Sequence, residues 1–435
     1  MPLGFRPLRF LGDALDRERI LAYSTILLAL ELGAFGFLVA GTHGLVVPLA
    51  EPTTTDFASF YAAGSLANAG TPQFAYDHAR HLAAEEQATA AGIEYQFFYY
   101  PPTFLLLCAL LARLPYLAAF VVFEVTSLVL YLVVACSILD RRGWASLVPL
   151  AAFPAVWWTL GLGQNAFLTA ALFGAATLCV DRRPAVAGML FGALCYKPHF
   201  ALLVPVALAA GGHWRVFAAA FASAVGLSLL SLALFGWQTW QDFLSAAAAS
   251  HATYESGRIT FGGFASPFGA VLLLGGPTLA AYAVQAAATL AAGLLVATVW
   301  RRKLRLSIRA AVLAAATLVA VPVVLVYDLM LATVAAAWLV RAGGKSGLSA
   351  PEKAVLAILC ILSVDPRSIA ETWHIPIAPL IALALLALVV RRCSEQPDRA
   401  RGRIARLPTA DQVSTMRSAE IDGIRKYPEA VRTTN

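Results

Sequence analysis

Long apolar runs recur along this chain and restrict its fold more than any other feature. Each of the longest has about twenty residues, enough for one helix to cross a hydrocarbon layer roughly 30 Å thick. These runs occupy residues 20–40, 117–139, 216–235, 279–300, 310–326 and 375–390. Apolar residues make up 60% of the chain and charged residues 13%. The mean hydropathy of +0.72 therefore excludes an ordinary soluble protein.

Shorter or interrupted apolar runs lie between the long ones. They occupy residues 98–112, 145–160, 166–180, 185–210, 264–276, 329–340 and 354–364. Together the runs predict about eleven to thirteen membrane segments. Only helices and closed barrels satisfy their backbone groups in lipid. The sequence thus predicts an all-α, polytopic membrane protein.

Basic residues flank the apolar runs and indicate how the chain is oriented. Arginines precede the first run, and further basic groups occur at 141–142, 182–183, 301–305, 341–345 and 391–392. The positive-inside rule places these groups in the cytoplasm. We therefore expect a cytoplasmic segment at 1–19, a transmembrane domain at 20–390 and a cytoplasmic basic tail at 391–435, which rests against anionic lipid headgroups.

The net charge of +7 follows from this flanking pattern. The basic residues are not interleaved with aromatics on one soluble face, so nucleic acid is not an expected partner. The first run is too long for a secretory signal and has no convincing cleavage site after it, so we expect it to be a retained helix.

One conflict remains in the expected topology. If 98–112 and 117–139 both cross the membrane, Arg141 and Arg142 lie outside. Either one of these segments is partial and re-entrant, or the basic pair breaks the positive-inside rule. The sequence leaves both alternatives open.

The first outward loop, 42–97, is long and has its own helix signals. A helix is predicted at 57–69, ended by Gly70 and Pro72, and Asp77 is expected to cap a second helix that ends near Gly92. Both are expected to lie along the membrane surface. The aromatic residues of 97–100 then suit the headgroup level, although a substrate-facing role is equally open.

Asp56 stands directly before the helix predicted at 57–69. Phe57, Phe60, Tyr61 and Gly64 follow at helical spacing and share one face. A carboxylate in this position can cap the first free amides of the helix. It can also serve as a catalytic base at the membrane surface, and taken alone the residue favours the capping role.

Five short motifs occur in a fixed order along the chain. They are Thr-Asp-Phe-x-x-Phe-Tyr-x-Ala-Gly at 55–64, Phe-x-Tyr-Pro-Pro at 98–102, Gly-Gln-Asn at 163–165, Lys-Pro at 197–198 and Tyr-Asp at 327–328. In this order, residues 21–390 resemble glycosyltransferase family 87. That family consists of multi-spanning enzymes of the GT-C class, which includes polyprenol-phosphate-mannose-dependent mannosyltransferases of bacterial envelopes.

The resemblance implies a GT-C fold in the bacterial inner membrane, with an active site that faces the periplasm. It implies a polyprenyl-phosphate sugar as donor and a hydroxyl of a glycolipid or glycan as acceptor. Asp56 matches the carboxylate that acts as general base in this class. Such a base is needed because an alcohol attacks an anomeric carbon poorly while it keeps its proton.

The phosphate leaving group requires partners where negative charge develops. Lys197 is the leading candidate because it interrupts the apolar run 185–210, where an ionisable residue is costly. Alternatively, the long side chain of Lys197 only extends its ammonium group to the membrane interface and has no function in catalysis. Further donor contacts are expected from Gln164, Asn165, His199, Arg258, Tyr327 and Asp328, and acceptor contacts from Tyr61, Tyr99 and Tyr100. Gln164, Asn165, Tyr327 and Asp328 suit plain polar turns equally well.

Other chemistries find little support in the sequence. The cysteines form no C-x-x-C pair, the histidines lack metal-ligand spacing, and no Walker or Rossmann glycine pattern occurs. We therefore expect no obligatory cofactor, although a divalent ion at the donor phosphate stays open. The competing classes are a transporter or flippase of lipid-linked saccharides and a polymerase. The chain lacks paired broken spans in corresponding halves, and its outward loops hold few arginines.

Overall fold

The computed structural model of the protein describes residues 6–43, 46–47, 54–141 and 143–395. Within these ranges all regular elements are helices, and no strand is formed. The α-helices are α1 (Arg6–Ala14), α2 (Arg17–Ala40), α3 (Phe57–Asn68), α4 (His78–Ala88), α5 (Pro102–Leu111), α6 (Tyr116–Leu139), α7 (Trp144–Ala151), α8 (Pro154–Leu162), α9 (Ala166–Cys179), α10 (Pro184–Ala193), α11 (Val204–Ala210), α12 (Trp214–Glu255), α13 (Pro267–Leu273), α14 (Thr278–Arg301), α15 (Leu306–Ala320), α16 (Met330–Gly343), α17 (Ala350–Leu362), α18 (Pro366–Trp373) and α19 (Ile377–Ser394).

Short 3-10 helices connect several of them. They are η2 (Pro72–Tyr76), η3 (Leu194–Tyr196), η4 (Pro198–Ala201), η5 (Phe261–Gly263), η6 (Val326–Leu329) and η7 (Gly344–Ser346). Most of the tail expected at 391–435 lies outside the described residues, and its first four residues belong to α19.

Six helices among the described residues are long and apolar enough to cross a membrane. They comprise α2, α6, α12, α14, α19 and the segment Val326–Gly343, which contains η6 and α16. The pair α7 and α8, bent by 56°, can form a seventh span. These findings confirm an all-α, polytopic membrane protein.

Most of the other expected segments are present as helices too short for a full crossing. Five apolar helical segments have between 10 and 17 residues: Pro102–Leu111, Ala166–Cys179, Pro184–Tyr196, Pro198–Ala210 and Leu306–Ala320. Proline and glycine interrupt the apolar runs here, so run length alone overestimates helix length. The expected count of about eleven to thirteen segments thus includes partial ones.

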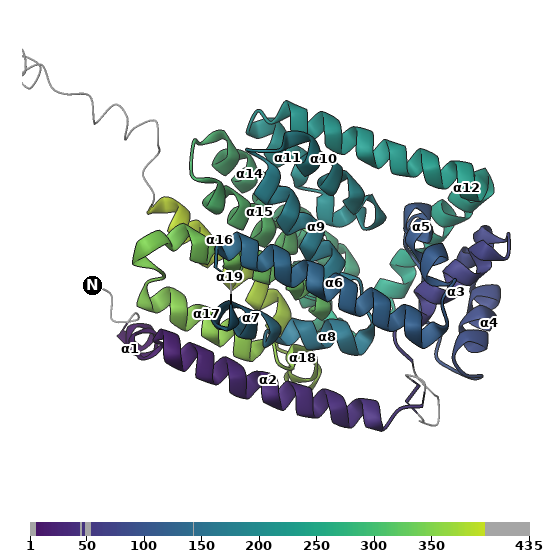
Figure 1. Ribbon diagram of the computed structural model, residues 1–435, viewed down its shortest axis with the longest axis horizontal. Coiled ribbons are helices and arrows are strands. Elements are labelled where there is room, and N and C mark those ends of the chain that lie inside the picture. The colour runs from purple at the N-terminus through teal and green to yellow at the C-terminus, as the bar shows by residue number, and fades with distance from the viewer. Residues whose placement is uncertain (1–5, 44–45, 48–53, 142, 396–435) are drawn as a thin grey trace, which may run out of the picture.

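Helix α5 bears on the conflict in the expected topology. Its ten residues extend for about 15 Å, which is half of a hydrocarbon layer of about 30 Å. The partial, re-entrant alternative therefore fits. From α5 the chain turns into α6, which runs from the end of the molecule with α3 and α4 toward the end with α1 (Figure 1). Arg141 follows the last residue of α6 and therefore lies at the same end of the molecule as α1 and the basic residues that begin α2 (Figure 1).

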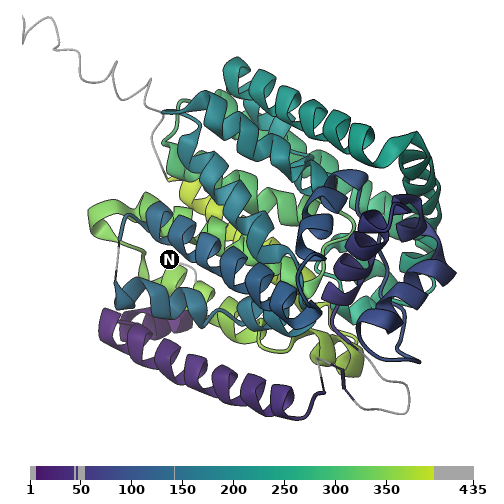
Figure 2. The same cartoon turned by 45° about the vertical axis from the view of Figure 1, so that its right-hand side comes forward.

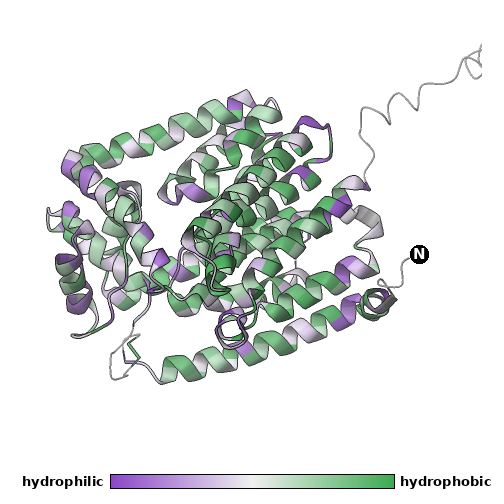
Figure 3. Ribbon diagram, turned by 180° about the vertical axis from the view of Figure 1, so that it is seen from behind, coloured by the Kyte–Doolittle hydropathy of each residue, from purple (hydrophilic) through white to green (hydrophobic). Residues whose placement is uncertain are grey.

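The centre of the bundle and its outer surface differ sharply in burial. Helix α15 is buried along almost its whole length and packs on α14, α16 and α19. By contrast, α2 has no buried residue. Hydrophobic residues cover the long helices, while hydrophilic residues gather at the helix ends and in the connecting segments (Figure 3). This pattern suits a bundle whose sides face lipid.

The loop between α2 and α5 folds into two packed helices. The helix predicted at 57–69 is confirmed as α3, and Asp77 caps α4 by accepting a 3.0 Å hydrogen bond from the Arg80 backbone N–H. Helix α3 is more deeply packed than a helix that merely lies on a membrane surface. A Cβ atom at Gly64 would overlap the Cys108 carbonyl oxygen of α5, so the small residue permits direct backbone contact.

The segment 236–263, which the sequence predicts to be on the outward side, is largely helical. Helix α12 continues through Gly236, whose φ of 80° and ψ of 166° break the helical geometry at that point. Its second part turns toward the end of the molecule that holds α3 and α5, where it packs on α5 and η2 (Figure 2). Only glycine adopts these dihedrals readily, so Gly236 sets the direction of the turn.

Candidate active site

Asp56 directs its carboxylate away from the helix that it precedes. Its backbone N–H donates to the Leu162 carbonyl at 2.8 Å, but its side chain makes no capping hydrogen bond to α3. Instead Oδ2 accepts a 2.6 Å hydrogen bond from Nε2 of Gln164. The capping role, which Asp56 taken alone favoured, is therefore wrong, because the side chain engages a tertiary partner in place of the local amides.

The turn between α8 and α9 presents Gln164 to Asp56. Gly163 ends α8 in the left-handed region, at φ 66° and ψ 44°, a conformation that suits glycine. Gln164 Oε1 then accepts a hydrogen bond from the Tyr100 hydroxyl at 3.3 Å and another from the Asn165 backbone N–H at 3.3 Å. Gln164 therefore holds Asp56 with one end of its amide and Tyr100 with the other.

Lys197 lies at a break between two short helices. η3 ends at Tyr196, and Pro198 opens η4, so the chain is not α-helical on either side of the lysine. The ammonium group is buried, and Nζ donates to Asp328 Oδ1 at 2.7 Å and to Asn165 Oδ1 at 3.2 Å. The alternative of a lysine that merely reaches the interface is therefore wrong.

Asp328 belongs to another break, between α15 and α16. It lies in η6, and its second oxygen accepts a 3.1 Å hydrogen bond from the Leu325 backbone N–H. Two rings also approach the lysine: the centroids of Tyr327 and Phe200 lie 5.2 and 5.1 Å from Nζ. Aromatic faces attract a cation at this range. The buried charge of Lys197 is thus compensated on several sides.

Five residues form one continuous chain of hydrogen bonds, which we term the polar network. It consists of Asp56, Gln164, Asn165, Lys197 and Asp328. Each residue stands at a helix end or a helix break, where the backbone departs from the regular helical ladder. Four of the five sequence motifs thereby meet at one site.

Burial raises the pKa of Asp56 to about 6. The hydrogen bond from Gln164 and the charge of Lys197 oppose this shift and keep the carboxyl group ionisable near neutral pH. A general base works best when its pKa lies near the operating pH. The half-buried side chain of Asp56 is therefore ionised at pH 7 but is more basic than an ordinary aspartate.

Two buried polar atoms beside Lys197 lack partners among the described residues. His199 Nε2 makes no hydrogen bond, and Asn165 Nδ2 lies near the Tyr100 hydroxyl without reaching hydrogen-bond geometry. Buried polar groups are almost always satisfied, so unpaired ones call for an explanation. Oxygen atoms of a bound ligand would satisfy both.

Three residues expected to bind substrate lie outside the polar network. The Tyr99 hydroxyl shares a 2.8 Å hydrogen bond with Thr253, and the Tyr61 hydroxyl donates to the Leu114 carbonyl at 2.9 Å. The Arg258 guanidinium lies 5.6 Å from the centroid of the Phe97 ring. Tyr100 is not one of the five residues of the polar network but contacts it, because its hydroxyl donates to Gln164 Oε1. Ligand contacts for the other three remain predictions.

Arg367 is a basic residue near the site that the sequence did not single out. It lies in the first turn of α18 and is close enough to Asp56 to lower the pKa of that carboxyl group. Its Nε donates to Glu371 at 2.9 Å. The signal in the sequence was its position after Asp365 and Pro366, on the expected outward side.

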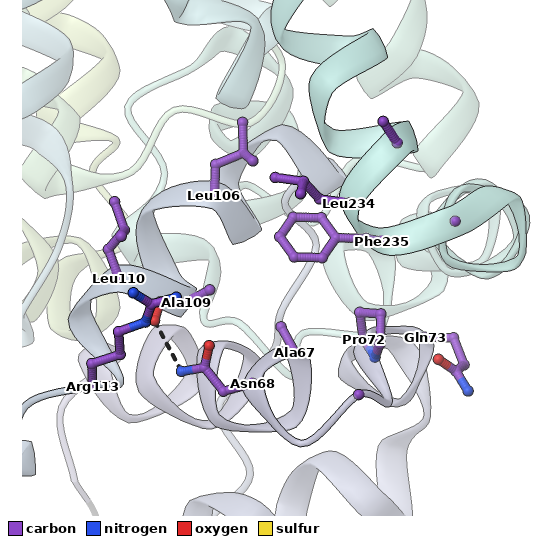
Figure 4. A pocket seen from close by; sticks show the side chains of 13 residues that line it. Ala67, Asn68, Pro72, Gln73, Leu106, Ala109, Leu110, Arg113, Leu234 and Phe235 are labelled. Atoms are coloured by element: carbon purple, nitrogen blue, oxygen red, sulfur yellow. Dashed lines mark hydrogen bonds between the residues drawn. The ribbon is translucent and has the colours of Figure 1, made fainter.

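A separate pocket of about 560 Å³ lies at the other end of α3 (Figure 4). Its lining includes Asn68, Leu106, Arg113 and Phe235, and Asn68 Nδ2 donates to the Ala109 carbonyl at 2.9 Å. The twelve residues of α3 place this pocket about 18 Å from Asp56.

Across the described residues, no three His, Cys, Asp or Glu side chains gather in a group that could hold a metal ion.

Comparison with known proteins gives one match. The family model of glycosyltransferase family 87 matches residues 98–327, more than half of the chain. No curated protein and no solved structure matches. The matched part contains Gln164, Asn165 and Lys197, whereas Asp328 directly follows it and Asp56 lies well before its first residue. The chain belongs to glycosyltransferase family 87.

Proposed function

We propose that this membrane glycosyltransferase transfers a hexose, mannose, from a polyprenyl-phosphate-linked donor to a hydroxyl of an envelope glycolipid or glycan. The reaction takes place on the periplasmic side of a bacterial inner membrane. The observation that carries the proposal is the polar network, which links a half-buried carboxylate to a buried lysine through hydrogen bonds. A group-transfer reaction needs a base at one end and charge stabilisation at the other.

Asp56 is the base in the proposed reaction. It takes the proton of the acceptor hydroxyl while that oxygen attacks the anomeric carbon. The bond between the anomeric carbon and the phosphate oxygen breaks, and polyprenyl phosphate leaves with the electron pair. A single displacement of this kind inverts the anomeric configuration. Proton removal in the transition state contributes about 10²- to 10⁴-fold to the rate.

Lys197 stabilises the leaving phosphate. Its ammonium group has three donors, of which Asp328 and Asn165 engage two. The third donor remains for a phosphate oxygen, and the unpaired His199 Nε2 and Asn165 Nδ2 offer neutral hydrogen bonds nearby. Preorganised donors at the position of developing charge are an effective form of catalysis.

The distribution of basic groups supports a periplasmic site. Arg17 begins α2, Arg141 follows α6 and Arg301 ends α14, all away from the loop that carries α3 and α4 (Figure 1). The positive-inside rule then assigns Asp56 to the outer face. A transporter or a polymerase of lipid-linked saccharides, left open by the sequence, is disfavoured by membership in a glycosyltransferase family.

Two measurements test the proposal. The purified protein, reconstituted in lipid, should transfer mannose from polyprenyl-phosphate mannose and not from a nucleotide sugar. Mass spectrometry of envelope glycolipids and glycans from a deletion strain should reveal the loss of one hexose. Unchanged glycans with altered solute uptake would contradict the assigned reaction, as would efficient use of a nucleotide sugar.

A further inference from the structure

A large apolar cavity lies between α2 and the rest of the bundle. Its volume is about 970 Å³, and its walls come from α2, α16, α17 and α19 together with the segment around α7. The cavity exists because α2 buries no residue and contacts the bundle mainly through α7 and α8. Leucine and isoleucine dominate the lining, including Ile20, Leu27, Leu30, Leu356 and Leu385.

The end of the cavity nearest α1 is positively charged. Arg17, Arg141 and Lys353 all line it. Among the residues that the structure describes, neither arginine forms an ion pair. Lys353 donates one hydrogen bond to the Leu15 carbonyl at 2.8 Å, which leaves two of its three donors.

One carboxylate also lines the cavity, but a neighbour already compensates it. Asp16 accepts a 2.8 Å hydrogen bond from the Arg19 backbone N–H, and its other oxygen lies 3.6 Å from Arg19 Nε. The three basic side chains therefore leave an excess of positive charge at the mouth of an apolar cavity. A ligand with an anionic head and apolar chains complements such a site.

Helix α1 lies at the charged end of this cavity and contributes Leu11 to its lining. A Cβ atom at Gly12 would overlap the Ala350 carbonyl oxygen, so α1 lies directly against the start of α17. Leu11 and Leu15 of this region line the cavity. From Arg17 to Leu30 the lining follows α2 for about 20 Å, about half of a bilayer of roughly 40–45 Å with its headgroups. The cavity thus has the depth of one leaflet.

We propose that this cavity binds an anionic glycerophospholipid of the cytoplasmic leaflet. Its phosphate lies against Arg17, Arg141 and Lys353, and its acyl chains follow the apolar walls toward Leu30. The volume of about 970 Å³ corresponds to roughly thirty water-sized groups, which suits the two chains of one phospholipid. Basic pockets between helices on the cytoplasmic side bind lipid headgroups of this class.

Charge argues against two other occupants of the cavity, the C-terminal tail of the chain and a zwitterionic lipid. The tail beyond α19 carries Arg399, Arg401, Arg403 and Arg406, so the positive mouth of the cavity would repel it. A zwitterionic lipid lacks the net charge that three basic groups select. None of the residues that line the cavity belongs to the polar network, so this proposal does not depend on the proposed transfer reaction.

Native mass spectrometry of the full-length protein tests the site. The protein is released from bilayers that contain phosphatidylglycerol and phosphatidylcholine, and retained lipid is measured at rising collision energy. Retention of phosphatidylglycerol by the double variant Arg17→Gln/Arg141→Gln should be at least about tenfold lower than by the wild type. Each basic group near the surface contributes about 1 kcal/mol to the binding of an anionic lipid. Arg113→Gln is the matched control because Arg113 is an exposed arginine that lines the other pocket.

A second variant keeps the test decisive if the double variant does not fold. Leu27→Trp adds bulk to the apolar wall without a change of charge and should also displace the lipid. Equal retention of phosphatidylglycerol by the wild type, the double variant and Leu27→Trp would overturn the proposal. Equal retention of phosphatidylcholine, or preferential retention of polyprenyl phosphate added as a third lipid, would overturn the assigned ligand.

Discussion

Gln164 donates a 2.6 Å hydrogen bond to the Asp56 carboxylate across 108 positions of the sequence. This contact fixes the direction of a carboxylate that would otherwise turn toward the first amides of α3. Gln164 lies within the part of the chain that matches the family model, whereas Asp56 precedes it. The site is thus assembled between the loop that joins α2 to α5 and the core of the bundle.

Replacement of Asp56 by Asn should abolish transfer while the protein remains folded and binds the lipid donor. The carboxylate makes no capping bond, so the main loss is the basic group itself. We expect turnover to fall by at least about 100-fold, measured with purified enzyme and a polyprenyl-phosphate sugar. Asp77→Asn is the matched control because Asp77 caps α4, and asparagine caps about as well. Near wild-type turnover by Asp56→Asn would exclude Asp56 as the base.

The rate of transfer should depend on pH through Asp56. Its pKa is raised to about 6, so the carboxylate required for proton removal is lost as the pH falls through 6 and is fully present well above it. Turnover should therefore rise with pH along a limb centred near 6. Gln164→Leu removes a hydrogen bond that lowers this pKa, so the limb should move to higher pH. A merely structural role for Gln164 would lower the rate but leave the limb in place.

Lys197→Ala should weaken donor use strongly, and Lys197→Arg should retain part of it because charge persists with a different geometry. Removal of one partner of a buried ion pair costs about 3–5 kcal/mol, so donor binding and thermal unfolding must be measured together. Asp328→Asn should destabilise the protein similarly. The double variant Lys197→Met/Asp328→Leu should unfold at a higher temperature than either single variant. Wild-type donor use by a folded Lys197→Ala protein would refute the phosphate role.

Substitution of Gly64 should disturb the site from a distance. Alanine there would press against the Cys108 carbonyl of α5, and overpacking of this kind costs about 1–3 kcal/mol. Because α3 follows Asp56 directly, its displacement should also lower turnover. Gly161→Ala, in open space within α8, is the control and should leave both the unfolding temperature and the turnover unchanged. Equal behaviour of the two variants would show that the contact between α3 and α5 is dispensable.

Cysteine labelling should place the two ends of the bundle on opposite sides of the membrane. Ala91→Cys, after α4, should react with an impermeant reagent from outside, and Lys303→Cys, after α14, should react only after the membrane is permeabilised. Both positions are exposed, and the orientation follows from the positive-inside rule. Labelling of Ala91→Cys from the cytoplasm alone would remove the basis for a periplasmic site.

The fold class and much of the local structure follow from residues that are close together in the chain. Apolar runs long enough to cross a membrane predict helices whatever their neighbours are. The cap at Asp77 and the helix that follows Asp56 depend on residues close together in the chain. Local chemistry decides such features, so the sequence predicted them correctly.

Which polar groups meet depends on how the helices pack against one another. Asp56 prefers Gln164 to the amides of α3, and Lys197 pairs with Asp328 across 131 positions. The cavity beside α2 likewise depends on how the helices pack. A buried charge must find a partner wherever the packing places one, and that partner has no fixed spacing in the sequence. The residues of the site could therefore be predicted, but their partners could not.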